Sequence, residues 1–346
     1  MSASHAVRMI SDPLTGQQRL QLANLPTPLE AAPRLAEHAG LTSLFIKRED
    51  MSGYALGGNK LRQIDFILAE AVAQQADVVV TTAGSQSNFC RSLAGAAAKL
   101  GLGCHLHLRA KMGIEPVGNL LLDDIFGARI SFTQRTDPWD PAIRGEMDAI
   151  AQGYREEGRT PYVAQLTGVS APLGVAGWMS GAAELLSDFE RVGVTPDVVI
   201  SVCGSGLTAG GLALGFKHLG SRVRVLGVSA QQPEQRLRDW IVSTANEAAD
   251  ALGFATRLEP GDLDIVDNQI APGYGMPSPA SIAAVRVAGR LEGLVLDPVY
   301  TGKGMAALLA EAGGGLLAGK SVVFLHSGGT PGLFNHAGAF AAKEAD

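Results

Sequence analysis

One lysine in the sequence is placed where covalent chemistry with an aldehyde is feasible. Lys60 follows Gly57 and Gly58 in "YALGGNKLRQ" (54–63), and apolar residues at helical spacing then continue to about residue 75. Lys60 is therefore expected in the first turn of a helix, where the positive helix end and partial burial both lower the pKa of an ammonium. A lysine so placed can be neutral and nucleophilic. On its own, however, a lysine at such a point is more often a solvated surface residue.

A glycine-rich loop, "CGSGLTAGG" (203–211), follows the apolar run 197–202 and precedes a helical pattern. Its backbone N–H groups can converge on an anion at the helix N-terminus, and Thr208 can add a hydroxyl. The spacing also fits a dinucleotide fingerprint. A dehydrogenase, however, needs an acidic residue about 20 residues later, and the next strand ends in "GVSA" without one. We therefore expect a site for a single phosphate, with a tight packing turn as the alternative.

The segment "AGSQSNFC" (83–90) follows the buried-strand pattern 77–82 and opens a further helix. Gln86, Ser87 and Asn88 are small donors at that helix N-terminus, a setting that suits a carboxylate. Ordinary N-capping would explain one of these residues but not the whole set. The loop is therefore a candidate site for the carboxylate of a ligand.

Two of the five tyrosines lie in loops rich in glycine and proline. Tyr274 lies in "APGYGMP" (271–277) and Tyr300 in "DPVYTGKG" (298–305), and we expect both to serve in acid–base chemistry. The alternative is a buried ring with a satisfied hydroxyl. "HSGGTPGLF" (326–334) likewise puts glycines and a hydroxyl after an apolar strand pattern.

Several other functional classes are disfavoured. "GGLLAGKS" (314–321) spells a P-loop, but a helix precedes it and a strand follows it, which is the reverse of the order that nucleotide binding needs. His105 and His107 have no further ligands that complete a metal site, so no metal is expected. The sequence offers no G-x-S-x-G elbow for a serine hydrolase at the strand-to-helix turn.

The overall composition suggests a cytoplasmic protein that binds a small molecule. A net charge of −6 gives no reason to expect nucleic acid as a partner. The three cysteines form no disulfide framework, which favours a reducing cytoplasm. No apolar run reaches the ~18 residues of a membrane-spanning helix, and the N-terminus has no apolar signal core, so no membrane partner is expected.

Strand-like and helix-like segments alternate along the chain, which predicts right-handed βαβ units, parallel sheets and an α/β fold. The expected strands are 77–82, 104–108, 129–132, 162–165, 197–202, 223–230, 294–299 and 321–326. A chain of 346 residues favours two lobes over one core. The active site is then expected in the cleft at the carboxyl ends of the strands.

The chain resembles the D-cysteine desulfhydrase / 1-aminocyclopropane-1-carboxylate deaminase family through six motifs that occur in the family's order. They are "LPTPLE", "IKREDMSGYALGGNKLRQ", "GSQSN", "APGYGMP", "DPVYTGKG" and "HSGGTPGLF". The motifs run from about residue 24 to about residue 335, and the ordered set is more specific than any one of them. The resemblance implies a homodimeric pyridoxal 5′-phosphate enzyme of fold type II, the two-lobed tryptophan synthase β-like fold. Each lobe would be an open, mainly parallel twisted sheet flanked by helices. The smaller domain would span residues 55–168, and the larger, cofactor-binding domain residues 1–54 plus 169–346.

The same resemblance implies roles for the loop residues. Lys60 would form the Schiff base with the cofactor aldehyde, and Asn88 would hydrogen-bond the ring O3′. The phosphate would be held by Gly204, Ser205, Gly206, Leu207 and Thr208. Ser87, Tyr274 and Tyr300 would lie on the catalytic side, and the substrate would contact Gln86, Ser87, Asn88, Phe89 and Thr301.

Thr301 and Ser327 resemble the desulfhydrase side of the family, since the deaminases have a glutamate and an apolar residue at these positions. A Ser327 hydroxyl beside the pyridine nitrogen would leave it neutral and the ring a weaker electron sink, which favours prompt loss of a β substituent. The expected reaction is β-elimination, with D-cysteine giving pyruvate, sulfide and ammonia. The alternatives are cyclopropane ring opening by the deaminase route, β-elimination from another amino acid such as cysteate and, outside the family, a nicotinamide-dependent dehydrogenase.

Two segments depart from the family pattern. Phe89 stands where His or Gln is usual after "QSN", and "GVSA" (168–171) replaces a "GGSN"-like stretch. Both changes remove polar groups. We therefore expect a substrate that is less polar than D-cysteine where it would contact these two segments. The alternative is that Phe89 packs beneath its helix and does not contact the substrate.

Overall fold

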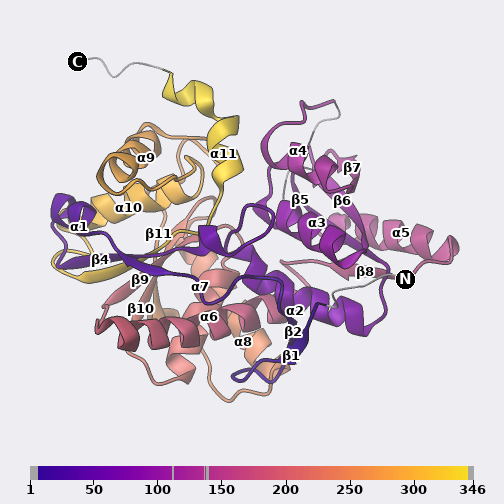
Figure 1. Ribbon diagram of the computed structural model, residues 1–346, viewed down its shortest axis with the longest axis horizontal. Helices are drawn as coiled ribbons and strands as arrows, with labels where there is room; N and C mark the ends of the chain where they lie inside the picture. The colour runs from indigo at the N-terminus through magenta and orange to yellow at the C-terminus, as the bar shows by residue number, and fades with distance from the viewer. Residues whose placement is uncertain (1–6, 111–112, 136, 138–139, 342–346) are drawn as a thin grey trace.

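Short apolar runs form the parallel strands of two sheets, as Figure 1 shows. The computed structural model describes residues 7–110, 113–135, 137 and 140–341. The larger sheet has the strand order β11 (Leu263–Val266), β10 (Arg224–Ser229), β9 (Val198–Cys203), β12 (Ser321–Leu325), β4 (Ser43–Lys47) and β3 (Leu29–Ala31). The smaller sheet has the order β7 (Arg129–Thr133), β6 (Gly103–Arg109), β5 (Val78–Gly84) and β8 (Pro161–Ala164). Every neighbouring pair is parallel except β3 with β4, so the α/β fold with parallel sheets is confirmed.

Helices cover both faces of the larger sheet. The helices of the chain are α1 (Pro33–Ala39), α2 (Lys60–Ala73), α3 (Asn88–Leu100), α4 (Gly118–Ile125), α5 (Ala142–Glu156), α6 (Ala171–Val192), α7 (Leu207–His218), α8 (Glu234–Ala251), α9 (Pro279–Glu292), α10 (Thr301–Ala312) and α11 (Thr330–Asn335). Val199 and Val323 face α6, α7 and α8, whereas Ile200 and Phe324 face α1, α9 and α10. Because successive side chains of a strand point to opposite faces, strands buried on both sides give the continuous apolar runs seen in the sequence.

The smaller sheet is covered in the same way. Val79 and Leu106 belong to one apolar cluster with α2, α3 and α4, and Val78 and Val80 pack with Tyr154 of α5 on the other face. This sheet lies wholly within residues 55–168, the range predicted for the smaller domain. The antiparallel ribbon of β1 (Met9–Ser11) and β2 (Gln18–Leu20) also contributes Leu20 to the cluster with α2. The limits of the two domains stay a prediction.

One predicted strand is wrong. Residues 294–299 form no strand, although Leu294 and Leu296 are buried. The Asp297 carboxylate accepts the backbone N–H groups of Val299, Tyr300 and Thr301 at 2.8–3.0 Å, which turns the chain into α10. Three short strands of the larger sheet, β3, β4 and β11, were not predicted from the sequence.

The glycine pair before α2 lies against the backbone of two other segments. Gly57 has φ +61°, and a Cβ on it would lie 2.1 Å from the carbonyl oxygen of Asp50. The N–H of Gly58 donates to the carbonyl of Glu49 at 2.9 Å, and the N–H of Asn59 donates to the carbonyl of Ser327 at 3.1 Å. Only glycine at position 57 allows this approach, which fixes the start of α2 beside the ends of β4 and β12.

A buried ion network then ties α2 to the larger lobe. The Arg62 guanidinium donates two hydrogen bonds of 2.8 Å to the Glu49 carboxylate and two, of 2.9 and 2.6 Å, to Glu184 of α6. Lys47, at the end of β4, donates to Glu184 and Asp188, each at 2.6 Å. Because loss of one partner would leave a buried charge uncompensated, the network holds the first turn of α2 in place.

The close approach at Gly57 predicts that alanine at this position destabilises the protein more than alanine at another glycine with positive φ. Gly40 offers a matched control, because its φ of +70° is similar but no atom lies within 4 Å of the position of its Cβ. Gly40→Ala should lower the free energy of unfolding by about 1–2 kcal/mol through backbone strain alone. Gly57→Ala should lose about 1–3 kcal/mol more, since its methyl group also meets the Asp50 carbonyl. Urea denaturation measures both losses, and equal values would contradict the steric constraint.

Candidate active site

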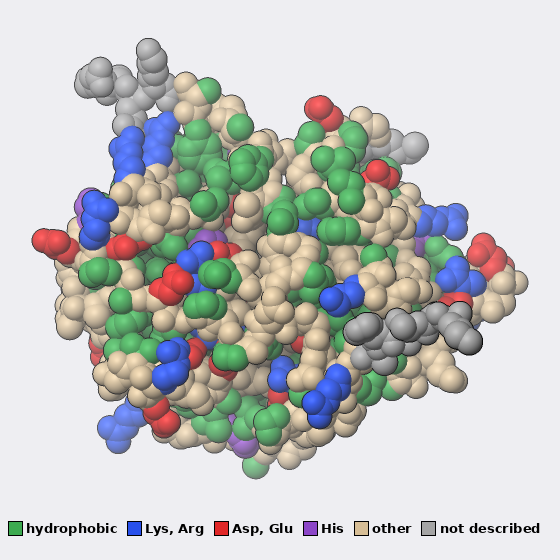
Figure 2. Space-filling view, viewed as in Figure 1, with side chains coloured by type: hydrophobic (Ala, Val, Ile, Leu, Met, Phe, Trp, Pro, Cys, Tyr) green, Lys and Arg blue, Asp and Glu red, His purple; other side chains and the backbone are tan. Residues whose placement is uncertain are grey.

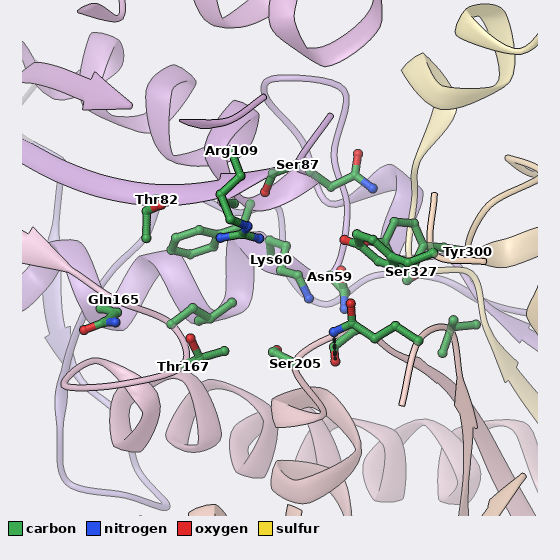
Figure 3. A pocket seen from close by; sticks show the side chains of 18 residues that line it. Asn59, Lys60, Thr82, Ser87, Arg109, Gln165, Thr167, Ser205, Tyr300 and Ser327 are labelled. Carbon is green, nitrogen blue, oxygen red and sulfur yellow. Dashed lines mark hydrogen bonds between the residues drawn. The ribbon is translucent and has the colours of Figure 1, made fainter. Parts of the chain in front are cut away.

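A cavity of about 1000 Å³, counting its open mouth, lies between the two lobes. Residues at or just beyond the carboxyl ends of β5, β6 and β9 line it, which is where ligands bind in open parallel sheets. The predicted site residues that line the cavity are Lys60, Ser87, Asn88, Phe89, Gly204, Ser205, Tyr274, Tyr300 and Ser327 (Figure 3). Five segments far apart in the sequence, at residues 87–89, 204–205, 274, 300 and 327, therefore meet around one lysine.

Lys60, the first residue of α2, lies in the middle of this group (Figure 3). Burial lowers the pKa of its amine from 10.5 to about 8. No carboxylate is found among the described lining residues, and burial raises the pKa of the nearby Cys203 thiol to about 12, so it supplies no negative charge. A large fraction of the Lys60 amine is therefore neutral near pH 8, the state that attacks an aldehyde.

The loop between β9 and α7 forms a cradle of N–H donors. Gly206, with φ +77°, precedes the first turn of α7, and in the described structure no protein acceptor takes the N–H groups of residues 205–208. Two carbonyl groups of this loop accept hydrogen bonds from side chains elsewhere in the chain. Trp240 Nε1 donates to the carbonyl oxygen of Ser205 at 2.9 Å, and Gln231 Nε2 donates to the carbonyl oxygen of Gly204 at 3.3 Å. The arrangement leaves several N–H groups and the positive end of α7 available to one anion.

A second helix N-terminus faces the cavity at the start of α3. Ser87 is the N-cap, and its Oγ accepts the N–H of Cys90 at 3.2 Å, so the hydroxyl proton itself stays available. Asn119 of α4 donates to Asn88 Oδ1 at 3.0 Å, which leaves the Asn88 amide group as a donor. The N–H groups of Asn88 and Phe89 have no acceptor among the described residues. This end of the cavity suits a carboxylate.

The two predicted tyrosines lie together. Their hydroxyls are hydrogen-bonded to each other, and the rings meet edge to face with centroids 6.0 Å apart. Burial raises the pKa of the Tyr300 hydroxyl well above its usual value. Lys303, in the first turn of α10, donates to the carbonyls of Ile270 and Gly273 at 2.9 and 3.1 Å and so fixes the loop that carries Tyr274.

Ser327 is positioned by the histidine before it. The buried His326 ring donates from Nε2 to the carbonyl of Val295 at 3.1 Å and accepts the N–H of Gly328 at Nδ1, at 3.3 Å. Burial lowers the pKa of His326, so the ring is neutral and keeps this arrangement of donor and acceptor. The backbone N–H of Asn59 also donates to the Ser327 carbonyl, so Ser327 has a fixed position relative to the neighbouring Lys60.

Some predicted site residues do not line the cavity. Thr301 is fully buried and donates to Asp297 Oδ1 at 2.7 Å, and Gln86 turns toward α4, where it donates to the carbonyl of Val117 at 3.0 Å. Thr208 is buried behind the loop and accepts from Asn59 Nδ2 at 2.9 Å. The remaining predicted loop residues, Gly206 and Leu207, form the start of α7.

Phe89 combines both of the predicted possibilities. Its ring is 4% exposed and belongs to the apolar cluster of the smaller lobe, yet it also forms part of the cavity wall. Other residues that line the cavity were not predicted from the sequence, among them Asn59, Thr82, Arg109, Gln165, Thr167 and Gln231. Arg109 carried one available signal, since it is the last residue of β6, and the neighbouring strand β5 leads into a loop of the site.

His105 and His107 belong to a hydrogen-bonded cluster away from the cavity. His105 Nε2 and His107 Nδ1 each lie 2.8 Å from the Ser131 hydroxyl, and His107 Nε2 lies 3.0 Å from Glu146 Oε2. Within the part of the chain that the structure describes, no group of three His, Cys, Asp or Glu side chains could hold a metal ion. In the same residues, no helix has both the length and the apolar character needed to cross a membrane.

Comparison with known proteins places these features in a family. A family model described as pyridoxal-phosphate dependent enzyme matches residues 20–328. Among curated proteins, the D-cysteine desulfhydrases of Salmonella typhi and Salmonella newport are each 36% identical over 328 residues, which cover 93% of this chain and 97% of theirs.

Solved structures give the same fold. A crystal structure of an ACC deaminase homologue matches with a TM-score of 0.85 and 31% identity, over 94% of this chain and 96% of that one. Diaminopropionate ammonia lyase of Escherichia coli, in its apo form, matches with a TM-score of 0.64 over 92% of this chain and 86% of its own. At 18% identity, the second likeness shows the fold alone.

The lowered pKa of Lys60 predicts how its reactivity depends on pH. Without added ligand, reductive methylation of Lys60 by formaldehyde and cyanoborohydride should rise through a midpoint near pH 8 and level off above it, because only the neutral amine attacks. In the urea-denatured chain the same lysine should titrate near pH ~10.4. Mass spectrometry of the Lys60 peptide follows both reactions. A native midpoint at the denatured value would contradict burial of the amine.

Proposed function

The chain belongs to the pyridoxal-phosphate-dependent enzyme family, and we propose that it is a lyase that removes a β substituent from a small amino acid, as a D-cysteine desulfhydrase does. The observation that carries this proposal is the place of Lys60. A half-buried lysine with a lowered pKa stands between two helix N-termini, one suited to a phosphate and the other to a carboxylate.

The residues present fit pyridoxal 5′-phosphate. We assign the phosphate to the N–H groups at residues 204–208, since a dianion matches free donors at the start of α7. Lys60 would hold the aldehyde carbon covalently, and the Asn88 amide, oriented by Asn119, would donate to the ring hydroxyl. The Ser327 hydroxyl would meet the ring nitrogen. Once bound, the cofactor supplies an electron sink for negative charge at the substrate Cα.

The protein's own groups would bind the substrate and move its protons. The α-carboxylate would lie at the start of α3, against the N–H groups of Asn88 and Phe89 and the Ser87 hydroxyl. Nζ of Lys60, whose lowered pKa favours the neutral amine, would take the Cα proton. The Tyr300 hydroxyl stays protonated at neutral pH, and with Tyr274 as its partner it can donate a proton to the leaving group.

D-Cysteine is the substrate that the relatives favour. With water, it would give pyruvate, hydrogen sulfide and ammonia. The likeness to an ACC deaminase homologue keeps cyclopropane ring opening as a second candidate. Ser327 supports β-elimination, because a hydroxyl does not keep the ring nitrogen protonated as an aspartate would.

We also propose a cytoplasmic homodimer. The described cysteines Cys90, Cys104 and Cys203 are all buried free thiols, which agrees with a reducing compartment. Apolar side chains gather at the top of the molecule in Figure 2, where Figure 1 places α4 and α11. Ile125 and Phe334 on these helices are 63% and 71% exposed, a surface that a second copy could cover. Analytical ultracentrifugation measures the dimer directly.

Replacing Lys60 tests the proposed function. The wild-type protein with cofactor should show a visible absorption band and form pyruvate and sulfide from D-cysteine. Lys60→Ala should lose that band and reduce turnover by several orders of magnitude, since it removes both the covalent link and a base. Incubation with 1-aminocyclopropane-1-carboxylate serves as the comparison. Efficient 2-oxobutanoate formation without pyruvate from D-cysteine would reverse the assignment in favour of ring opening.

A charge at position 205 tests the phosphate site. Ser205 lines the cavity at the start of α7, so Ser205→Asp should place a carboxylate against the cofactor phosphate. Ser205→Asn adds a neutral side chain of the same size and is the matched control. Equilibrium dialysis should show cofactor binding at least about tenfold weaker for the aspartate variant than for the asparagine variant. Equal dissociation constants would move the phosphate elsewhere in the cavity.

A further inference from the structure

Arg109 is a cation in the cavity with no hydrogen-bonded carboxylate among the described residues. It is the last residue of β6, half-buried, and its guanidinium donates to no acceptor among the described residues. Other arginines of the smaller lobe do have carboxylate partners, as Arg135 has in Glu146 and Arg159 in Asp77, each at 2.7 Å. A partly desolvated guanidinium with five donors and no acceptor is expected to bind an anion from outside the chain.

The cofactor and the α-carboxylate each have another site. In Figure 3, Arg109 and Ser205 lie on opposite sides of Lys60, so Arg109 is not part of the cradle assigned to the phosphate. The free N–H groups at the start of α3 suit the α-carboxylate, and Lys60 is used by the covalent link. Among the charged side chains of the described cavity lining, Arg109 is then the one that these roles leave unassigned.

We propose that Arg109 binds a second negatively charged group, a carboxylate or a sulfonate, on the side chain of the amino-acid substrate. The inference rests on the proposed function, which it narrows to substrates with an anion at or beyond the β carbon. A planar guanidinium accepts either group in a bidentate arrangement. The ring of Phe89 also lines the cavity and gives it an apolar surface.

The reaction balances with a sulfonate on the β carbon. The Cβ–S bond breaks and its electron pair leaves with sulfite, while the Cα proton goes to Lys60. Water then completes pyruvate and ammonia, and no oxidant or reductant is needed. Arg109 would bind the sulfonate before this step and the sulfite after it, with a permanent positive charge that Phe89 and the cavity hydroxyls lack.

This substrate class differs from the one expected from Phe89 alone. A phenylalanine at that position supplies no donor and favours a less polar substrate. Arg109 comes from another strand and supplies up to five donors to the same cavity. Together, Arg109 and Phe89 therefore favour a substrate whose anionic group binds Arg109 in a cavity that also has an apolar surface.

Anionic and neutral substrates, compared in three variants, test the proposal. The kcat/KM values of D- and L-cysteate are compared with those of D- and L-cysteine and of β-chloroalanine, in the holoenzyme. In Arg109→Gln, the ratio of anionic over neutral substrates should fall by about ten- to a hundredfold. Arg109→Lys should keep part of the wild-type preference for anionic substrates. Arg222→Gln removes an exposed arginine remote from the cavity and should leave the ratio at its wild-type value.

Calorimetry supplies a readout that needs no turnover. Succinate, a dianion without an amine, should bind the cofactor-loaded wild type at least about tenfold more tightly than succinamate, and Arg109→Gln should abolish this difference. The proposal would be overturned if Arg109→Gln left unchanged either the kcat/KM ratio of anionic over neutral substrates or the affinity ratio of succinate over succinamate. An equal loss for every substrate would also overturn it, since Arg109 would then hold the shared α-carboxylate.

Failure of the proposed function looks different. In that case no amino acid would give pyruvate and no visible band would form, whereas succinate binding, measured then on the protein without cofactor, would still report on Arg109. Thermal melting of each variant, compared with that of Arg222→Gln, shows whether the fold is intact. A melted Arg109→Gln would be replaced by Arg109→Lys as the deciding variant, with a smaller but measurable fall in the ratio.

Discussion

The approach of three backbone segments behind Lys60 is the constraint on which the site depends. The loop before α2 packs so closely on Asp50 that a Cβ at Gly57 would lie 2.1 Å from its carbonyl oxygen. One residue further on, the N–H of Asn59 meets the carbonyl of Ser327. These contacts join the loops after β4 and β12 to the first turn of α2, and the buried Arg62 network keeps the helix there. The lysine thus projects between the carboxyl ends of both sheets.

The charges around that lysine explain what the cavity can bind. Two helix N-termini and the side chains of Lys60 and Arg109 face it, and none of the described lining residues is acidic. Burial disfavours the protonated form of Lys60, which leaves the amine reactive and leaves the positive field of the helix ends to the ligands. A phosphate, an α-carboxylate and, by our proposal, a second anion on the substrate each have a separate place in this arrangement.

Local patterns in the sequence predicted most of the fold and the centre of the site. Lys60, the loop at residues 204–208 and Asn88 were found because each stands where a strand or loop gives way to a helix. The predicted strand 294–299 was wrong, because an apolar run does not reveal that Asp297 will take the next N–H groups. Arg109 was missed and Thr301 was expected at the cavity, since only the packing of distant segments decides which side chains reach it.

The central claim is that Lys60 is the residue that carries the cofactor. Borohydride reduction of the protein loaded with pyridoxal 5′-phosphate makes such a link permanent, and mass spectrometry of the digested protein then locates it. The structure predicts a single phosphopyridoxyl group on the peptide that contains Lys60. A label on Lys303, which is also buried near the cavity tyrosines, or on Lys320 of the "GGLLAGKS" segment, would contradict the account.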